Sequence, residues 1–178
     1  MATSRRSFLS TSLSSIGCAA PTALAQGQTK PETAPEDAAQ QIFKLYPVGA
    51  VEKRPGHNAR LRLFDPYVEA LDGLEDFSHA FVLYWFDRND TPERRGTLQV
   101  HPRGNKANPL TGVFACRAPV RPNLIALTLC KILLVVDNTV LIDSIDALDG
   151  SPVLDIKPYI PSLDRVSQGV RLPGWLNS

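Results

Sequence analysis

Potential metal ligands and excess charge are both scarce in this chain of 178 residues. It contains three cysteines and three histidines, and its formal net charge is +1. No cysteines and histidines occur at the spacing of a zinc site, so we expect no metal centre. A net charge this close to zero gives no general attraction to polyanions. Any nucleic-acid site would therefore have to be a local basic patch.

Glycine-rich phosphate loops and internal repeats are missing as well. The Gly-x-Gly-x-x-Gly pattern of dinucleotide-binding α/β folds does not occur, so a nucleoside cofactor would have to bind in another way. The length suits one domain. With 43% hydrophobic and 21% charged residues, the composition is ordinary for a globular protein and indicates no particular function.

The first 25 residues contain the three parts of an export signal in the usual order. Arg5 and Arg6 form a twin-arginine pair, residues 13–20 are moderately apolar, and Ala23 and Ala25 are small residues where a signal peptidase reads. The apolar stretch falls short of the roughly 20 residues that a stable membrane span needs. We therefore predict a twin-arginine signal peptide over 1–25 and export to the periplasm. The alternative is a disordered basic N-terminus on a cytoplasmic protein.

The cysteines leave two questions open. Cys18 follows a faint lipoprotein pattern, which is an alternative to cleavage after Ala25. Cys116 and Cys130 would remain in the mature chain, in apolar runs where buried inert thiols are common. A disulfide between these two is the alternative in an oxidising compartment.

The remaining chain divides into a linker over 26–42, one domain over 43–166 and a C-terminal tail over 167–178. The linker has two prolines and few apolar residues, which is typical of a flexible segment. Alternating or continuous apolar runs separated by turn residues predict strands over 46–51, 60–64, 80–86, 97–101, 112–116, 123–136, 139–145 and 153–156. Apolar spacing over 67–74 predicts one short helix. This pattern favours an all-β fold, a single antiparallel β-barrel domain with one short helix.

Basic side chains occur in two turn-rich loops. Arg103 lies in the loop over 101–106, and its guanidinium group could bind a phosphate or carboxylate in bidentate fashion. Arg117 and Arg121 each lie close to a proline, beside Asn123. Loop residues of this kind are most often merely solvated. Prolines that hold the loop, however, favour a ligand-binding function.

The sequence resembles the TsaA-like family over roughly residues 46–164. The family writes one stretch Ala-Thr-Arg-Ser-Pro-x-Arg-Pro-Asn-Pro-Ile-Gly. The matching positions here are Arg117, Pro119, Arg121, Pro122, Asn123 and Ile125, and the departures are Cys116, Ala118, Leu124 and Ala126. A Phe-Ser-His stretch ending at His79 and the segment over 149–159 carry the resemblance further. A long N-terminal loop with Pro-Arg-Gln, which touches the cofactor in many members, has no counterpart in the short segment over 52–57.

The resemblance implies an S-adenosylmethionine-dependent methyltransferase, a homodimer, that acts on threonylcarbamoyl-modified adenosine next to the tRNA anticodon. It implies a cofactor site made of His79, Ala80, Arg103, Asp146, Ala147, Leu148 and Asp149. By the same resemblance and the loop chemistry, we expect the substrate to be bound by Arg117, Arg121 and Asn123. Asp149 precedes a glycine and could equally be a turn former. Asp155 and Lys157 alternate on one strand face, so we expect a structural ion pair.

The predicted export to the periplasm conflicts with a tRNA-modifying function and leads to a rival hypothesis. An exported protein meets neither tRNA nor abundant S-adenosylmethionine, although the twin-arginine route carries folded proteins that could load a cofactor beforehand. The alternative function is therefore an exported module that binds a small ligand resembling S-adenosylmethionine on the same barrel, without catalysis.

Overall fold

The computed structural model describes residues 42–176, and the residues from Phe43 onward belong to one compact unit. The expected signal peptide, the expected linker up to residue 41, and residues 177–178 lie outside the described residues. In the described part of the chain, no helix is long and apolar enough to cross a membrane.

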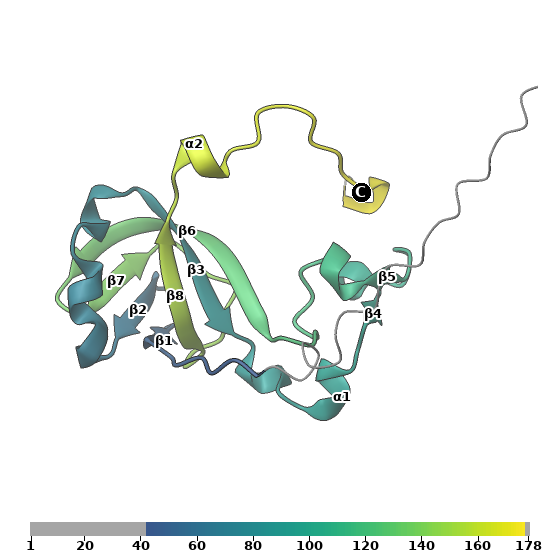
Figure 1. The fold of residues 1–178 in the computed structure, drawn as a ribbon, viewed down its shortest axis with the longest axis horizontal. Helices are drawn as coiled ribbons and strands as arrows, with labels where there is room; N and C mark the ends of the chain where they lie inside the picture. Colours follow the sequence, from purple (N-terminus) through teal and green to yellow (C-terminus); the bar gives the residue numbers. More distant parts are fainter. Residues whose placement is uncertain (1–41, 177–178) are drawn as a thin grey trace, which may run out of the picture. The chain divides into compact units, whose positions relative to one another are not determined.

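Antiparallel strands close into a barrel in the order β1-β2-β7-β6-β3-β8 (Figure 1). The barrel strands are β1 (Gly49–Glu52), β2 (Ala59–Leu63), β3 (His79–Trp85), β6 (Ile125–Val136), β7 (Thr139–Ile142) and β8 (Pro152–Pro158). The predicted all-β barrel is thereby confirmed. A further pair of short strands, β4 (Gln99–Val100) and β5 (Thr111–Gly112), forms a separate two-stranded sheet.

Alternation along the strands fills the barrel interior. In β2, Leu61 and Leu63 are buried while Arg60 and Arg62 are exposed. This is the period of two that a half-buried strand requires. The arginine side chains remain at the surface, where the Nε of Arg62 lies 2.6 Å from Oε1 of Glu52. A surface ion pair of this kind contributes about 0–1 kcal/mol, so the stability of β2 comes mainly from its buried leucines.

Strands β1 and β2 approach each other closely at Gly49. Gly49 is in register with Leu63, and a Cβ atom placed on Gly49 would lie 2.3 Å from the carbonyl oxygen of Arg62. The φ angle of Gly49 is not in the left-handed region, so space rather than backbone conformation requires glycine here. Any side chain at this position would push the two strands apart.

The long apolar run after residue 123 forms a single strand, β6, as expected. Residues 125–131 of β6 pair with β3, and residues 132–136 pair with β7, with a shift of register between Ile132 and Leu134. One strand therefore pairs with two neighbours, and the register shift lies where β6 passes from β3 to β7. The predicted hairpin at residues 137–138 is confirmed, with Asp137 at a φ of 50°.

Two expected elements differ in the structure. The expected strand over 112–116 ends after Gly112, and Val113–Ala115 forms a 3-10 turn (η6). The predicted single helix over 67–74 is replaced by two 3-10 segments, η2 (Asp65–Leu71) and η3 (Leu74–Asp76). Gly73 lies between them at a φ of 83°, which interrupts any continuous helix.

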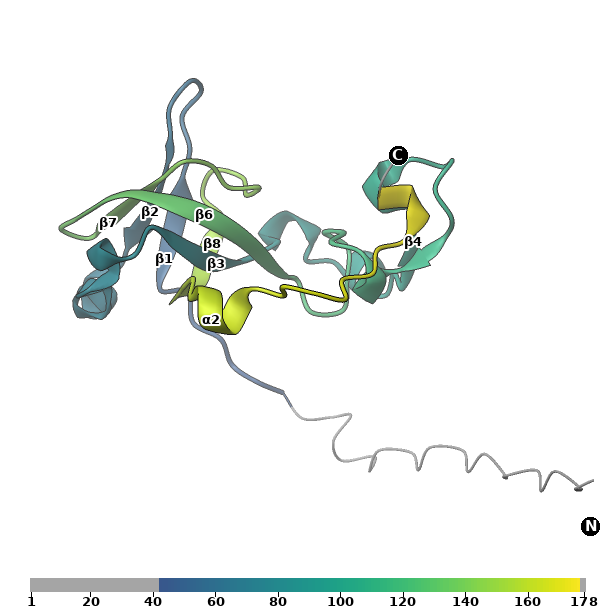
Figure 2. The same ribbon diagram turned by 90° about the horizontal axis from the view of Figure 1, so that it is seen from above.

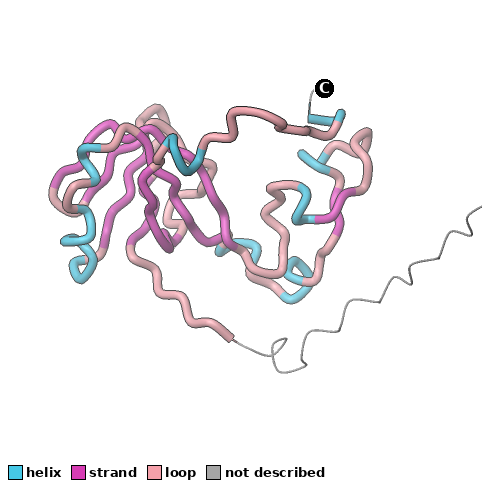
Figure 3. The backbone as a smooth tube through the Cα atoms, turned by 45° about the horizontal axis from the view of Figure 1, so that its top comes forward, coloured by secondary structure: helices cyan, strands magenta, loops and turns pink. Residues whose placement is uncertain are grey.

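Short helical turns also occur elsewhere among the described residues (Figure 3). The α-helical turns are α1 (Pro92–Arg95) and α2 (Pro161–Asp164), and the 3-10 turns are η4 (Asp87–Asn89), η5 (Pro102–Gly104) and η7 (Gly174–Leu176). Each α-helical turn begins with a proline, which suits the first helical position because its missing N–H would be unsatisfied there.

The C-terminal tail runs from α2 back to the sheet formed by β4 and β5 (Figure 2). Its apolar residues Val166, Val170 and Leu172 are 70%, 62% and 58% exposed, so the tail packs loosely along its length. It ends in η7, where Trp175 and Leu176 lie against the loops beside β4 and β5.

Candidate functional site

Five of the ten predicted site residues line two adjoining hollows. The first, here called the lobe pocket, lies beside β4 and β5 and has a volume of about 830 Å³. The second, here called the mouth pocket, lies where β3 ends and has a volume of about 300 Å³. Arg117 and Pro119 line both pockets, so the two hollows share a wall.

The lobe pocket is basic and aromatic. Arg103 and Arg117 line it together with Phe114 and Trp175, and no aspartate or glutamate is among its lining residues. Phe114 is 85% exposed. An exposed aromatic beside two guanidinium groups is suited to a flat anionic ligand, because the ring offers a stacking surface and the arginines offer charge.

The backbone at Arg103 is in the left-handed region, with a φ of 60°. This conformation costs a non-glycine residue roughly 1–2 kcal/mol. The loop is held by Asn108, which is buried and donates from Nδ2 to the Pro102 carbonyl at 2.9 Å, and by a 2.8 Å contact between His101 Nδ1 and the Asn108 carbonyl. These internal bonds stabilise the strained position that presents Arg103 at the pocket.

The mouth pocket contains the loop that carries Asp146, Ala147 and Leu148. The barrel anchors this loop through its backbone. The hydroxyl of Tyr84 donates to the carbonyl of Asp146, and Lys53 Nζ donates to the carbonyls of Ile145 at 3.1 Å and Ala147 at 2.9 Å. The backbone of the loop is therefore fixed from the core side, while its outer side chains remain available.

Tyr84 links the barrel core to the mouth pocket. Its side chain is 2% exposed, and burial raises the pKa of the phenol above its usual value. A raised pKa keeps the hydroxyl protonated, so that it remains a donor to the Asp146 loop.

The mouth pocket combines an available carboxylate with an available guanidinium. The carboxylate of Asp146 and the guanidinium of Arg117 are exposed, and neither makes a hydrogen bond or an ion pair with any residue in the range 42–176. Asp87, in contrast, lies near Arg88 and accepts from the hydroxyl of Ser151. Asp146 and Arg117 are thus the charged groups best placed to meet a zwitterionic ligand.

Arg121 holds the loop that carries Arg117. Its Nη2 donates to the carbonyl of Val113 at 2.7 Å and to that of Cys116 at 3.1 Å, and its Nε is buried with no hydrogen-bond partner among residues 42–176. These bonds draw residues 113–116 into a turn, which is the physical reason that the expected strand stops at Gly112. The structure gives Arg121 a bracing function that the sequence did not indicate.

The other predicted residues lie elsewhere. His79 begins β3, five residues before Tyr84, a distance of roughly 16 Å along a strand. Its Nδ1 lies 2.9 Å from the hydroxyl of Ser78. The side chain of Ala80 is 2% exposed and belongs to the core. Asn123 lines neither pocket.

Asp149 lies next to the mouth pocket without lining it. One of its carboxylate oxygens accepts from the backbone N–H of Lys53 at 2.8 Å. The turn expected after it is present, because Gly150 has a φ of 81°. One copy of the chain therefore brings together Arg103, Arg117 and residues 146–148, but not His79.

The two cysteines of the domain are free. Cys130 is fully buried, and burial raises the pKa of its thiol to about 12, so it stays protonated and inert. Cys116 is half-buried and lines the lobe pocket. Within residues 42–176, no group of three or more potential ligands is placed to hold a metal ion.

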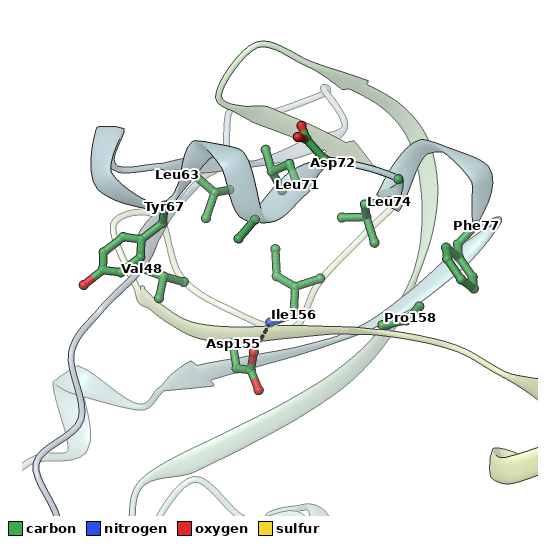
Figure 4. A pocket seen from close by; sticks show the side chains of 12 residues that line it. Val48, Leu63, Tyr67, Leu71, Asp72, Leu74, Phe77, Asp155, Ile156 and Pro158 are labelled. Atoms are coloured by element: carbon green, nitrogen blue, oxygen red, sulfur yellow. Dashed lines mark hydrogen bonds between the residues drawn. The ribbon is translucent and has the colours of Figure 1, made fainter.

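A third hollow, of about 380 Å³, is mostly apolar and is lined by none of the predicted site residues (Figure 4). Segments η2 and η3 lie over it with Tyr67 and Leu71, and Ile156 of β8 points into it. At its rim, Asp155 pairs with Lys157 at 2.8 Å, which confirms the expected structural pair. The charged residues among its lining are the carboxylates Asp72 and Asp155, and no arginine or lysine of the described residues lines it to bind a phosphate or a carboxylate.

Sequence reasoning missed most of the lining of the two pockets, including Lys53, Tyr84 and Trp175. Lys53 lies in the segment that lacks the family's Pro-Arg-Gln pattern, and Tyr84 reads as an ordinary core residue. Trp175 follows a tail without periodicity. The presence of an aromatic residue in a tail that otherwise has only polar and aliphatic residues is the one signal that could have drawn attention to it.

The comparisons with known proteins agree with this fold. The family described as tRNA-methyltransferase O N-terminal domain matches residues 47–165. A protein of Methanocaldococcus jannaschii named a probable S-adenosyl-L-methionine-binding protein is 45% identical over 123 residues, which are 69% of this chain and 97% of that protein. The mouse tRNA (adenine(37)-N6)-methyltransferase is 44% identical over 105 residues, which are 59% of this chain and 24% of that enzyme.

A solved structure shows the same relationship. The crystal structure of TrmO from Pseudomonas aeruginosa is 29% identical, with a TM-score of 0.56, over 73% of this chain and 62% of that one. The present chain thus spans nearly the whole of the M. jannaschii protein, less than two thirds of the solved chain and about a quarter of the mouse enzyme.

Proposed function

Because the chain belongs to the tRNA-methyltransferase O N-terminal domain family, we propose that it binds S-adenosylmethionine and methylates N6 of an adenosine next to the tRNA anticodon. The observation that carries the proposal is the mouth pocket, where the carboxylate of Asp146 and the guanidinium of Arg117 line one wall without partners among residues 42–176. The amino-acid end of S-adenosylmethionine has an ammonium and a carboxylate, which these two groups complement.

S-adenosylmethionine supplies the methyl group, which passes from its sulfur to the adenine N6 while that nitrogen loses a proton to solvent. The residues of the chain bind the methyl donor and the acceptor and orient them toward each other. Asp146 holds a cationic or hydroxyl group, and the apolar side chains of Ala147 and Leu148 beside it exclude water. Holding two reactants in line removes much of the entropic barrier, so positioning alone can provide most of the acceleration.

The specific acceptor we propose is adenosine that already carries a threonylcarbamoyl group. This modification ends in a carboxylate, and a guanidinium group binds a carboxylate in bidentate fashion. Arg103 lines the pocket adjoining the mouth pocket and is exposed there, so it is the residue that we assign to this carboxylate or to a nearby phosphate.

We also propose that the complete site needs a second copy of the chain. The outer face of the barrel at β3 and β6 is apolar. Phe81 pairs with Leu129 and Leu83 with Leu127, and these two β6 leucines are 45% and 43% exposed. His79 lies at one end of this face and the mouth pocket at the other. Two copies packed with antiparallel strands on this face would bring His79 of one near the pocket of the other.

Replacing Leu129 with arginine should convert a dimer of the domain into a monomer. A charge in the middle of an apolar contact must be desolvated without a partner, which opposes association. Sedimentation of residues 26–178 would measure the change. Arg60→Lys, on the outer surface of β2, is the matched control and should leave the dimer intact. A wild-type domain that sediments as a monomer at every concentration would contradict the proposed dimer.

The activity is tested directly with residues 26–178 and methyl-labelled S-adenosylmethionine. We expect label in tRNA that carries threonylcarbamoyladenosine and much less in tRNA without that group. Transfer to both tRNAs alike would contradict the specific acceptor but support the methyltransferase. Donor binding without transfer to either would contradict the enzyme and leave a binding module.

We propose that residues 1–25 direct the protein to the twin-arginine route. This route carries folded proteins, so the domain would pass through the cytoplasm in its folded form, where tRNA and S-adenosylmethionine are present. The periplasm is then the destination of the mature chain, and the cytoplasm is the place where it acts. If the signal is not used, the enzyme stays in the cytoplasm throughout.

Changing Arg5 and Arg6 to lysine should leave full-length protein in the cytoplasm, because the paired guanidinium groups are the recognised feature of the signal. Cell fractionation and N-terminal sequencing of the mature chain would measure this. Changing Lys30, which lies after the signal, to arginine is the control and should be exported normally. Normal processing of the double variant would show that the twin-arginine assignment is wrong.

A further inference from the structure

We propose that the lobe pocket is a binding site for one unpaired RNA nucleotide, whose base stacks on Trp175 of the C-terminal tail and whose phosphate meets Arg103 and Arg117. This inference rests on the proposed function, because it specifies where that function holds its RNA. It gives a function to Trp175, which lies outside the family match over residues 47–165, although the two arginines lie inside that match.

Charge distinguishes the two pockets. Among residues 42–176, two arginines and no carboxylate line the lobe pocket, whereas the lining of the mouth pocket combines Asp87 and Asp146 with the cationic side chains of Lys53, Arg88 and Arg117. S-adenosylmethionine carries a sulfonium and an ammonium against a single carboxylate, so its net charge is positive. A nucleotide is an anion. The mixed charges of the mouth pocket therefore suit the methyl donor, which carries charges of both signs, and the basic groups of the lobe pocket favour the nucleotide.

Aromatic surface points to a base rather than to a bare phosphate. Phe114 is 85% exposed at the lobe pocket, and Trp175, which is half-buried, lines the same hollow from the tail. Proteins that hold single-stranded nucleic acid combine a positively charged groove with aromatic rings on which bases stack. The volume of about 830 Å³ falls within the usual range for small-molecule sites, so it can accept a nucleotide.

The course of the tail supports a ligand-binding function for Trp175. The preceding apolar residues Val170 and Leu172 are 62% and 58% exposed, so they do not hold the tail to the domain. Trp175 of the tail nevertheless lies in the wall of the lobe pocket. A loosely packed segment that ends in such a wall can move aside to admit a ligand and return to cover it.

The fluorescence of Trp175 can be used to measure ligand binding in the lobe pocket. The chain has two tryptophans, and the Trp85→Phe variant of residues 26–178 makes Trp175 the single emitter. Phenylalanine keeps an aromatic ring beneath Arg95, which lies 5.3 Å from the Trp85 ring, so the fold should persist. We expect adenosine monophosphate to quench the fluorescence saturably, adenosine to bind roughly tenfold more weakly, and inorganic phosphate not to quench.

Calorimetry then compares Trp175→Ala with Trp175→Phe in the otherwise unchanged domain. Loss of stacking should weaken adenosine monophosphate binding by roughly 5- to 100-fold in the alanine variant, and by much less in the phenylalanine variant. Affinity for S-adenosylmethionine should change less than twofold in both. Quenching by S-adenosylmethionine but not by the nucleotide, or unchanged nucleotide affinity in Trp175→Ala, would overturn the proposal.

The failure of this proposal and of the proposed function can be told apart. Methyl transfer to tRNA that is unaffected by Trp175→Ala would overturn the nucleotide site and leave the enzyme intact. Stacking of the nucleotide on Trp175 in a domain that transfers no methyl group would support the site and overturn the enzyme.

Discussion

Changing Asp146 to asparagine is expected to weaken S-adenosylmethionine binding by about tenfold or more and to reduce methyl transfer in proportion. Asparagine keeps the size of the side chain but removes its charge. A hydrogen bond to a charged group contributes about 1.5–3 kcal/mol, and 1.4 kcal/mol corresponds to tenfold in affinity. The exposure of Asp146 places the effect near the lower end of that range. Calorimetry with the purified domain would measure it.

The fold should survive this change, because Tyr84 bonds to the backbone carbonyl of residue 146 and not to its side chain. Asp143→Asn is the matched control on the same loop. Its carboxylate accepts from the backbone N–H groups of Lys131 at 2.9 Å and Ser144 at 2.7 Å and lines neither pocket. The control should therefore bind the donor normally even if it unfolds more easily. Equal donor affinities in the two variants would refute the assignment of Asp146.

Changing Gly49 to alanine is expected to destabilise the domain by roughly 3 kcal/mol or more. The new methyl group would lie 2.3 Å from the carbonyl oxygen of Arg62, and the contact is with backbone that cannot rotate away. Strands β1 and β2 would have to separate, which disturbs the barrel at a closed seam. Overpacking typically costs 1–3 kcal/mol, and a rigid backbone contact belongs at or above the upper end.

Urea denaturation of residues 26–178 would measure the loss as a lower midpoint. Gly112→Ala is the matched control, because a Cβ there meets no atom within 4 Å and the φ of Gly112 is −59°. Its free energy of unfolding should change by less than about 0.5 kcal/mol. Similar midpoints for both variants would mean that β1 and β2 can relax apart at no great cost.

The barrel was predictable because the order of polar and apolar residues within each strand indicates which side chains are buried. The alternation of arginine and leucine over 60–63 fixes which face is buried, and the two polar residues after Val136 mark a hairpin. The stretch from Gly112 to Cys116 has the same local character but does not form a strand. Arg121 takes up two of its carbonyls from outside the stretch, and no local pattern reports that interaction.

The site was only partly predictable, for the same reason. Arg103, Arg117 and Asp146 have side chains whose chemistry is visible in a sequence, and the structure places them at adjoining pockets. Which residues share a pocket depends on the path of the whole chain. His79 is separated from Asp146 by the length of β3, and Trp175 reaches the lobe pocket only because the tail turns back. Apart from the presence of an aromatic residue in the tail, neither arrangement can be inferred from spacing or composition.

The position of Arg117 in the shared wall makes the two pockets thermodynamically dependent on each other. A ligand in either pocket that restrains the Arg117 side chain bears the entropic cost of fixing its rotamer. A ligand that then binds in the other pocket does not bear this cost again. When the same Arg117 rotamer serves both ligands, each ligand strengthens the binding of the other. Thermodynamic linkage requires that the nucleotide changes the affinity for the methyl donor by the same factor as the methyl donor changes the affinity for the nucleotide. A domain built in this way would hold the methyl donor most tightly when RNA is present and release both more readily once either has left.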